Sequence, residues 1–206
     1  MTSRRAFCGL LLVLACLLPT AGAWTHPHAF AECGLDFVFD EKGLAGVRVR
    51  MAFDEMFSVI VLQEIDPDLY AEDDPELDRE HVEELELMEF KDYGYFTHIL
   101  VDGRRVRVEE VEDFSARVRN GRLTYELFVP CAVAAGTEPR RVTVSVFDDT
   151  YYREMTLPNG SVSLQGGERF SLNPEIGEIE AFAYRYGGLK LVPQGVSVGL
   201  QRKGDG

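Results

Sequence analysis

Hydrophobic and polar residues alternate along much of this chain, a pattern typical of half-buried β-strands. Residues 29–39 and 47–51 alternate on either side of a turn at Lys42-Gly43 and together predict a β-hairpin. Turn residues at Gly103, Asn120-Gly121 and Asn159-Gly160 separate further alternating stretches, and Asn-Gly is a strong hairpin signal. The strands expected there cover 95–101, 104–111, 114–119, 122–129, 141–148, 161–165 and 178–186.

Two stretches have helical spacing instead. Asp54 precedes Met56, Val59 and Ile60, so it is expected to cap a helix that ends near residue 65. Asp78 is expected to cap a second helix over about 79–92 in the same way. The fold class that follows is α+β, mainly antiparallel β and sandwich-like, with a two-helix insertion at about 54–92. Residues 24–190 form one β-rich domain in this interpretation, and 191–206 form a frayed C-terminal tail.

The first 23 residues read as a secretory signal peptide. Arg4 and Arg5 precede an apolar stretch at 6–18, and the small residues Ala21-Gly22-Ala23 form a cleavage site. Cleavage after Ala23 predicts a periplasmic protein that begins Trp24-Thr25-His26-Pro27-His28. A lipid anchor at Cys16 is less favoured because apolar residues follow it. No later apolar run approaches the roughly 20 residues of a membrane span, so the mature chain is expected to be soluble.

The chain is acidic, with 35 Asp and Glu against 21 Lys and Arg and a formal net charge of −14. Loss of Arg4 and Arg5 with the leader makes it two units more negative. This balance disfavours nucleic acid as a partner, because phosphate binding needs clustered basic side chains. It suits attraction of divalent cations, although a plain solvated acidic surface explains it as well.

Cys33 and Cys131 are the cysteines left after cleavage. In an oxidising compartment they are candidates for one disulfide, and two buried thiols are the alternative. The sequence has no nucleophile elbow, no phosphate-binding glycine loop and no His-Glu-x-x-His helix. We therefore expect no enzymatic activity.

An ordered set of short motifs resembles a bacterial periplasmic family, domain of unknown function 1007. The motifs are His26-Pro27-His28-Ala29-Phe30, Phe39-Asp40 with Gly43-Leu44, Phe53-Asp54-Glu55-Met56-Phe57-Ser58, Phe90-Lys91-Asp92-Tyr93-Gly94-Tyr95-Phe96-Thr97, Val101-Asp102-Gly103 and Asp148-Asp149-Thr150-Tyr151. Members are described as periplasmic components of ABC-type transport systems, and some are linked with nickel/cobalt-type permeases and zinc acquisition. The resemblance implies a periplasmic accessory protein that binds a divalent metal, zinc first and nickel or cobalt as alternatives, beside an inner-membrane metal permease.

Four residues are the candidate metal ligands. His26 and His28 lie two residues apart on an extended segment, so their imidazoles are expected to point to the same side. Asp148, in the family's motif after a strong apolar strand, and His98, on a predicted strand, are further candidates. The alternatives are exposed terminal histidines, a turn carboxylate and a surface strand histidine.

A β-sandwich interaction or assembly module without a metal role is the second hypothesis for function. Aromatic residues around the helical insertion are the predicted contact surface for the permease, with burial in the core as the alternative for at least two of them. These residues are Phe57, Phe90, Tyr93 and Tyr95.

Overall fold

The computed structural model describes residues 28–69 and 74–204. The expected leader and His26 lie outside the described residues. Strands β1 (Ala29–Phe39) and β2 (Gly43–Phe53) form the predicted antiparallel hairpin. Asp40 holds its turn, because the Oδ1 atom accepts hydrogen bonds from the backbone N–H groups of Lys42 (2.7 Å) and Gly43 (3.0 Å).

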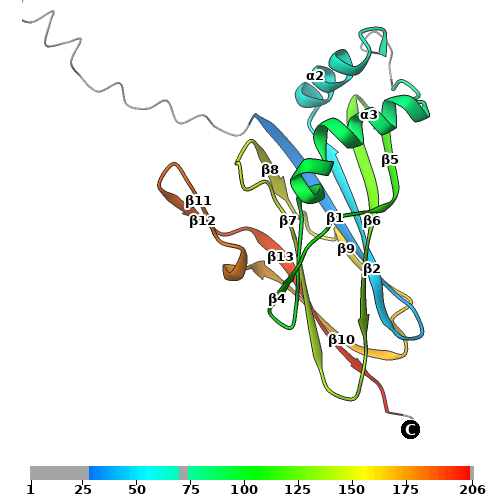
Figure 1. The fold of residues 1–206 in the computed structure, drawn as a ribbon, viewed down its shortest axis with the longest axis vertical. Coiled ribbons are helices and arrows are strands. Elements are labelled where there is room, and N and C mark those ends of the chain that lie inside the picture. Colours follow the sequence, from blue (N-terminus) through cyan, green and yellow to red (C-terminus); the bar gives the residue numbers. More distant parts are fainter. Residues whose placement is uncertain (1–27, 70–73, 205–206) are drawn as a thin grey trace, which may run out of the picture.

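Two sheets make up most of the fold (Figure 1). The first has the order β5-β6-β2-β1-β8, and β9 also pairs with β1. Its further strands are β5 (Glu112–Arg119), β6 (Arg122–Ala134), β8 (Arg153–Thr156) and β9 (Val162–Gln165). The second sheet has the order β10-β13-β7-β3-β4. Its strands are β3 (Thr97–Val101), β4 (Arg104–Val106), β7 (Arg140–Val146), β10 (Phe170–Glu178) and β13 (Gln194–Arg202).

Antiparallel pairing predominates, so the predicted mainly antiparallel, sandwich-like α+β fold is confirmed. The exceptions are β8 and β9, which pair with β1 in parallel. A small hairpin, β11 (Tyr184–Tyr186) with β12 (Leu189–Leu191), stands apart from both sheets, and a short 3-10 helix, η3 (Glu180–Phe182), precedes it (Figure 1).

Both predicted helices are present and lie at one end of the sheets (Figure 1). Asp54 caps α2 (Glu55–Ile65) by accepting from the Phe57 N–H at 3.0 Å, and Asp78 caps α3 (Arg79–Glu89) through the His81 N–H. The second helix ends three residues earlier than expected, and a 3-10 segment, η2 (Lys91–Phe96), follows it. No helix in the described part of the chain is long and apolar enough to cross a membrane.

The predicted C-terminal tail at 191–206 is wrong for most of its length. Residues Gln194–Arg202 form β13, which lies between β10 and β7 in the second sheet. Val196, Val198 and Leu200 point into the core at twofold spacing. The glycines at 195 and 199 and the polar end of the chain favour a tail in the sequence, but the apolar residues at 196, 198 and 200 alternate without interruption and form the strand.

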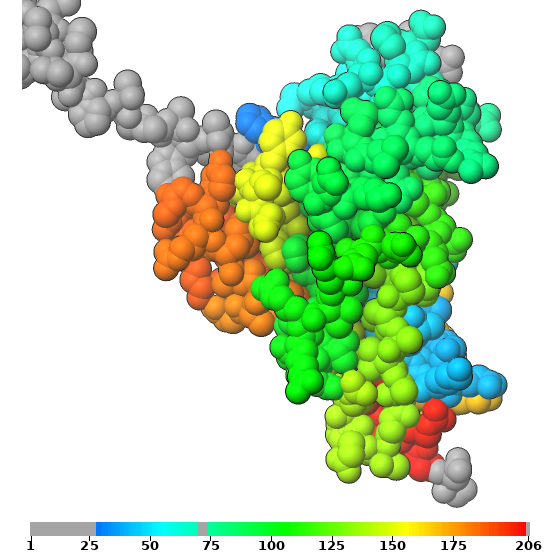
Figure 2. Space-filling view, viewed as in Figure 1, coloured from blue at the N-terminus to red at the C-terminus, as the bar shows by residue number. Residues whose placement is uncertain are grey.

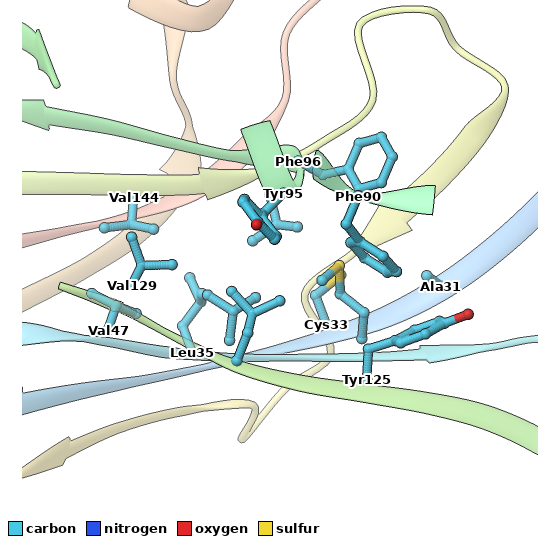
Figure 3. Close-up of a cluster of buried hydrophobic side chains, with 14 of the residues drawn as sticks. Ala31, Cys33, Leu35, Val47, Phe90, Tyr95, Phe96, Tyr125, Val129 and Val144 are labelled. Atoms are coloured by element: carbon cyan, nitrogen blue, oxygen red, sulfur yellow. The ribbon is translucent and has the colours of Figure 1, made fainter. Parts of the chain in front are cut away.

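Facing sides of the two sheets enclose the hydrophobic core (Figure 3). Leu35, Val47 and Val129 from the first sheet lie opposite Val144 from the second. At the helical end the core becomes aromatic, because Phe90 directly follows α3 and packs on Tyr125 with ring centroids 4.4 Å apart. The helical insertion is thereby fixed to the first sheet.

Cys33 and Cys131 are both buried and unbridged, so the alternative of two thiols holds over the candidate disulfide. The register explains this. Cys33 on β1 faces Met51 on β2, and Met51 faces Tyr125 on β6. Cys131 lies six residues beyond Tyr125, about 20 Å along the strand at the usual rise, which is too far for a bridge.

We expect thiol titration of the chain 24–206 to find both cysteines reduced and unreactive until the chain unfolds. Burial raises the pKa of the Cys33 thiol to about 12 and that of Cys131 to about 11, so almost no thiolate forms in the folded state. Ellman's reagent should react slowly with the native chain. In urea it should react rapidly with both thiols. Absence of free thiol in urea without reductant would contradict this arrangement.

Candidate metal site at the start of β1

The outer face of β1 carries the first described candidate ligand. His28, Phe30 and Glu32 are exposed, whereas Ala29 and Ala31 between them are buried. This alternation means that the exposed residues share one side of the strand. His26, two residues upstream of His28, lies outside the described residues.

His28 is anchored to the connection between β7 and β8. Its backbone N–H donates to the carbonyl oxygen of Tyr152 at 2.9 Å, and its ring lies 5.3 Å from the Tyr152 ring, centroid to centroid. The parallel register of β1 and β8 continues from this contact, with Ala29 beside Arg153 and Phe30 beside Glu154.

Glu154 therefore shares the outer face with His28. Arg153 is buried and its neighbours Tyr152 and Glu154 are exposed, so β8 alternates in step with β1. Parallel partners lie about 4.8 Å apart, which makes Glu154 a diagonal neighbour of His28. No hydrogen bond or ion pair within the described ranges engages the Glu154 carboxylate, so it is available as a ligand.

An acidic pocket of about 570 Å³ adjoins this face. Its lining comprises Phe30, Ala31, Glu32, Asp54, Glu55, Met56, Arg122, Glu154 and Thr156. Arg122, the cation of the lining, is already engaged: it donates to the carbonyl oxygens of Ala52 and Phe53 and to Glu32. The carboxylates outnumber it, so the pocket favours cations.

Asp148 has a structural role in the fold. It is 2% exposed, and its Oδ1 accepts from the backbone N–H (2.9 Å) and the hydroxyl (2.5 Å) of Thr150. Its Oδ2 accepts from the Arg153 backbone N–H at 3.2 Å and pairs with the Arg153 guanidinium at 3.4 Å. These bonds shape the turn before β8 and occupy both oxygens, so we do not retain Asp148 as a ligand.

Arg153 joins this turn to the helical end of the molecule. Its guanidinium pairs with Asp148 on one side and with Glu89, the last residue of α3, on the other. Four aromatic rings surround it at 4.8–5.7 Å from the guanidinium carbon to each centroid; they belong to Phe57, Tyr93, Phe96 and Tyr152. The Arg153 side chain thus links Tyr152, which contacts His28, to both helices.

His98 on β3 lies apart from His28. Its ring stacks on Phe147 at 3.8 Å between centroids, and its Nε2 lies 3.3 Å from the Phe147 carbonyl oxygen. Burial lowers the pKa of His98 below 6.5, although the Phe147 carbonyl and the charge of Asp149 oppose this shift. Within the described residues, no three His, Cys, Asp or Glu side chains come together as a metal site.

The family model described as a protein of unknown function, DUF1007, matches residues 11–175. The chain belongs to the DUF1007 family. It is also 30% identical over 76 residues to an "Uncharacterized 15.5 kDa protein in trpE 3'region" of Spirochaeta aurantia, a match over 36% of this chain and 54% of that protein. The chain thus spans about half the length of this relative.

In this DUF1007 protein the structure brings one unforeseen residue, Glu154, beside His28 and leaves Asp148 and His98 elsewhere. Glu154 was missed because β8 is four residues long and pairs in parallel with a strand more than 120 residues earlier in the chain. The alternation of exposed Tyr152 and Glu154 around Arg153 is the signal that could have indicated a strand there.

The His98 environment predicts a pH dependence for this DUF1007 chain. The folded-state pKa lies below the unfolded value, so the unfolded chain binds more protons and stability falls as the pH drops below about 6.5. We expect His98→Gln to make the decrease in unfolding free energy between about pH 7 and pH 5 shallower. The slope of the unfolding free energy against pH should change by at most the amount that corresponds to one bound proton. Urea unfolding at a series of pH values measures this, and identical slopes would contradict it.

Proposed function

We propose that this chain is an exported, periplasmic protein that binds a divalent metal, zinc first and nickel or cobalt as alternatives, and works beside an inner-membrane metal permease. One observation carries the proposal. His28 and Glu154 share the outer face of the parallel β1–β8 pair, next to an acidic pocket, and His26 lies two residues upstream.

These residue types suit zinc. Imidazole nitrogen and carboxylate oxygen both bind Zn²⁺ at about 2.0–2.2 Å, and His26, His28 and Glu154 together supply three ligands. A site with three protein ligands leaves a coordination position for water or for a group of the next carrier. Such an open position suits a protein that passes its metal on.

Carboxylates near the proposed site attract cations, and a hydrogen bond holds one of the ligands in place. The carboxylates of Glu32 and Glu55 line the pocket beside Glu154, so cations concentrate there. Tyr152 holds the His28 backbone through its carbonyl oxygen. This hydrogen bond fixes the position of the His28 backbone before the metal binds.

Isothermal titration of zinc into the metal-stripped, untagged chain 24–206 tests the proposal. We expect binding tighter than about 1 μM at pH 7.5 and a loss of at least about 100-fold in His26→Ala/His28→Ala, because two of three ligands are removed. Affinity should also fall as the pH drops through about 6.5, where free imidazoles become protonated.

Matched variants separate this site from the alternatives. Glu154→Gln should weaken zinc binding by about tenfold or more, whereas Glu168→Gln, which changes an exposed carboxylate outside the pocket lining, should leave it unchanged. Zinc binding that persists in the double histidine variant and disappears in His98→Ala would move the site to β3. No binding of zinc, nickel or cobalt would overturn the metal role.

The second candidate function is a protein-interaction module without a metal role. The apolar outer face of α2, described below, favours it. A partner that co-purifies equally well with the His26→Ala/His28→Ala variant in the presence of chelator would support this second function over the first.

A further inference from the structure

Helix α2 is apolar on both sides. Phe57, Val61 and Leu62 point into the core and are almost fully buried. On the opposite side Met56, Val59 and Ile60 are 64%, 38% and 54% exposed. A helix that is hydrophobic all round is normally covered all round. Figure 2 shows α2, in cyan, at the outer surface of the molecule.

The exposed stripe continues onto the first sheet. Met56 lines the acidic pocket together with Phe30, which is 50% exposed at the start of β1. Phe30 is held there by Asp54, whose Oδ2 accepts its backbone N–H at 2.7 Å while Oδ1 caps α2. The helix and the strand therefore present one fixed surface, which we call the α2 surface: Phe30, Met56, Val59 and Ile60.

The charges beside the α2 surface indicate which kind of partner suits it. Glu32, Asp54 and Glu55 line the same pocket as Phe30 and Met56, and Arg122 there is held by two backbone carbonyl oxygens and Glu32. A second copy of this chain would bring two acidic rims together, which is unfavourable. An anionic membrane is disfavoured for the same reason.

We propose that the α2 surface binds a partner-protein segment that carries apolar side chains together with Lys or Arg. The apolar residues would cover Met56, Val59 and Ile60, and the cations would meet Glu55, whose carboxylate makes no ion pair among the described residues. The inference goes beyond metal binding, since none of these apolar residues is a ligand. It also places the partner next to the pocket that adjoins His28 and Glu154.

Fluorescence anisotropy with synthetic peptides tests the proposal. The probe is a labelled peptide with leucine and lysine at helical spacing, titrated with the chain 24–206 in EDTA so that metal plays no part. Two comparison peptides keep the pattern: one replaces lysine by glutamate and the other replaces leucine by serine. We expect the leucine/lysine peptide to bind at least about tenfold tighter than either comparison peptide, because apolar contact and charge both contribute.

Met56→Ser/Ile60→Ser should weaken binding of the leucine/lysine peptide by about tenfold or more, because two exposed anchors are lost. Leu87→Ser/Leu189→Ser is the matched control, since it removes two equally exposed apolar side chains elsewhere and should change nothing. Unchanged thermal unfolding of both variants confirms that they fold.

Three results would overturn the proposal. The first is equal binding of the peptide to the wild-type chain and to Met56→Ser/Ile60→Ser. The second is a wild-type dimer in sedimentation that the same substitutions dissociate. The third is binding of the wild-type chain to phosphatidylglycerol vesicles that the substitutions abolish. Because EDTA is present throughout, none of these results depends on whether the chain binds zinc.

Discussion

Replacing Arg153 by methionine is expected to lower the free energy of unfolding by about 3–5 kcal/mol, because removal of one member of a buried ion pair leaves the other charge unpaired. Arg153 is 7% exposed and is the shared partner of Asp148, itself almost fully buried, and of Glu89. Urea denaturation at neutral pH measures the loss. Arg141→Met, which removes an exposed pair with Glu175, should cost no more than about 1 kcal/mol.

A compensating variant separates the loss of charge pairing from a general packing defect. Arg153→Met combined with Glu89→Leu should regain part of the lost stability, since an apolar replacement of a buried pair is often neutral. The account of this cluster fails if Arg153→Met costs less than about 1 kcal/mol, or if adding Glu89→Leu makes the chain less stable still.

Phe90→Ala is expected to cost about 3–5 kcal/mol, the usual range for truncating a buried phenylalanine. Its ring is 1% exposed and lies 5.6 Å from the Phe96 ring, 5.3 Å from the Phe114 ring and 4.4 Å from the Tyr125 ring, centroid to centroid. The substitution leaves a cavity where the helical insertion meets the sheet.

Leu87→Ala, on the helix α3 that Phe90 directly follows, is the control for Phe90→Ala. Leu87 is 59% exposed, so its truncation should change stability by no more than about 0.5 kcal/mol. Similar losses for the two variants in urea denaturation would contradict the buried position of Phe90.

Much of the local structure was predictable because its causes are local. Asp54 and Asp78 cap the helices as predicted, through backbone N–H groups three residues on. The β1–β2 hairpin follows from twofold alternation on either side of its Lys42-Gly43 turn. Helix caps and tight hairpins can therefore be predicted from the spacing of residues in the sequence.

Burial and long-range pairing were harder to predict. Of the aromatic residues proposed for the permease contact, Phe57, Phe90 and Tyr95 are buried and Tyr93 is exposed. Helical spacing cannot tell which side of an apolar helix faces the core. On α2 the exposed side carries Met56, Val59 and Ile60 instead.

At the candidate site, too, the local features were predictable and the long-range ones were not. His26 and His28 are visible as a pair in the sequence, whereas Glu154 lies beside His28 only through a parallel pairing that no local pattern encodes. Asp148 was singled out by its motif, but the bonds that engage it come from Thr150 and Arg153. A motif can mark a residue that shapes a turn as readily as one that binds a metal.

Anomalous diffraction at the zinc absorption edge, from crystals of the chain 24–206 grown with zinc, shows whether His26, His28 and Glu154 hold the metal. We expect one strong peak at the start of β1, within about 2.0–2.2 Å of imidazole nitrogens of His26 and His28 and of a carboxylate oxygen of Glu154. A zinc ion bound elsewhere, for example between His98 and Asp149, with His28 and Glu154 free of metal, would contradict it.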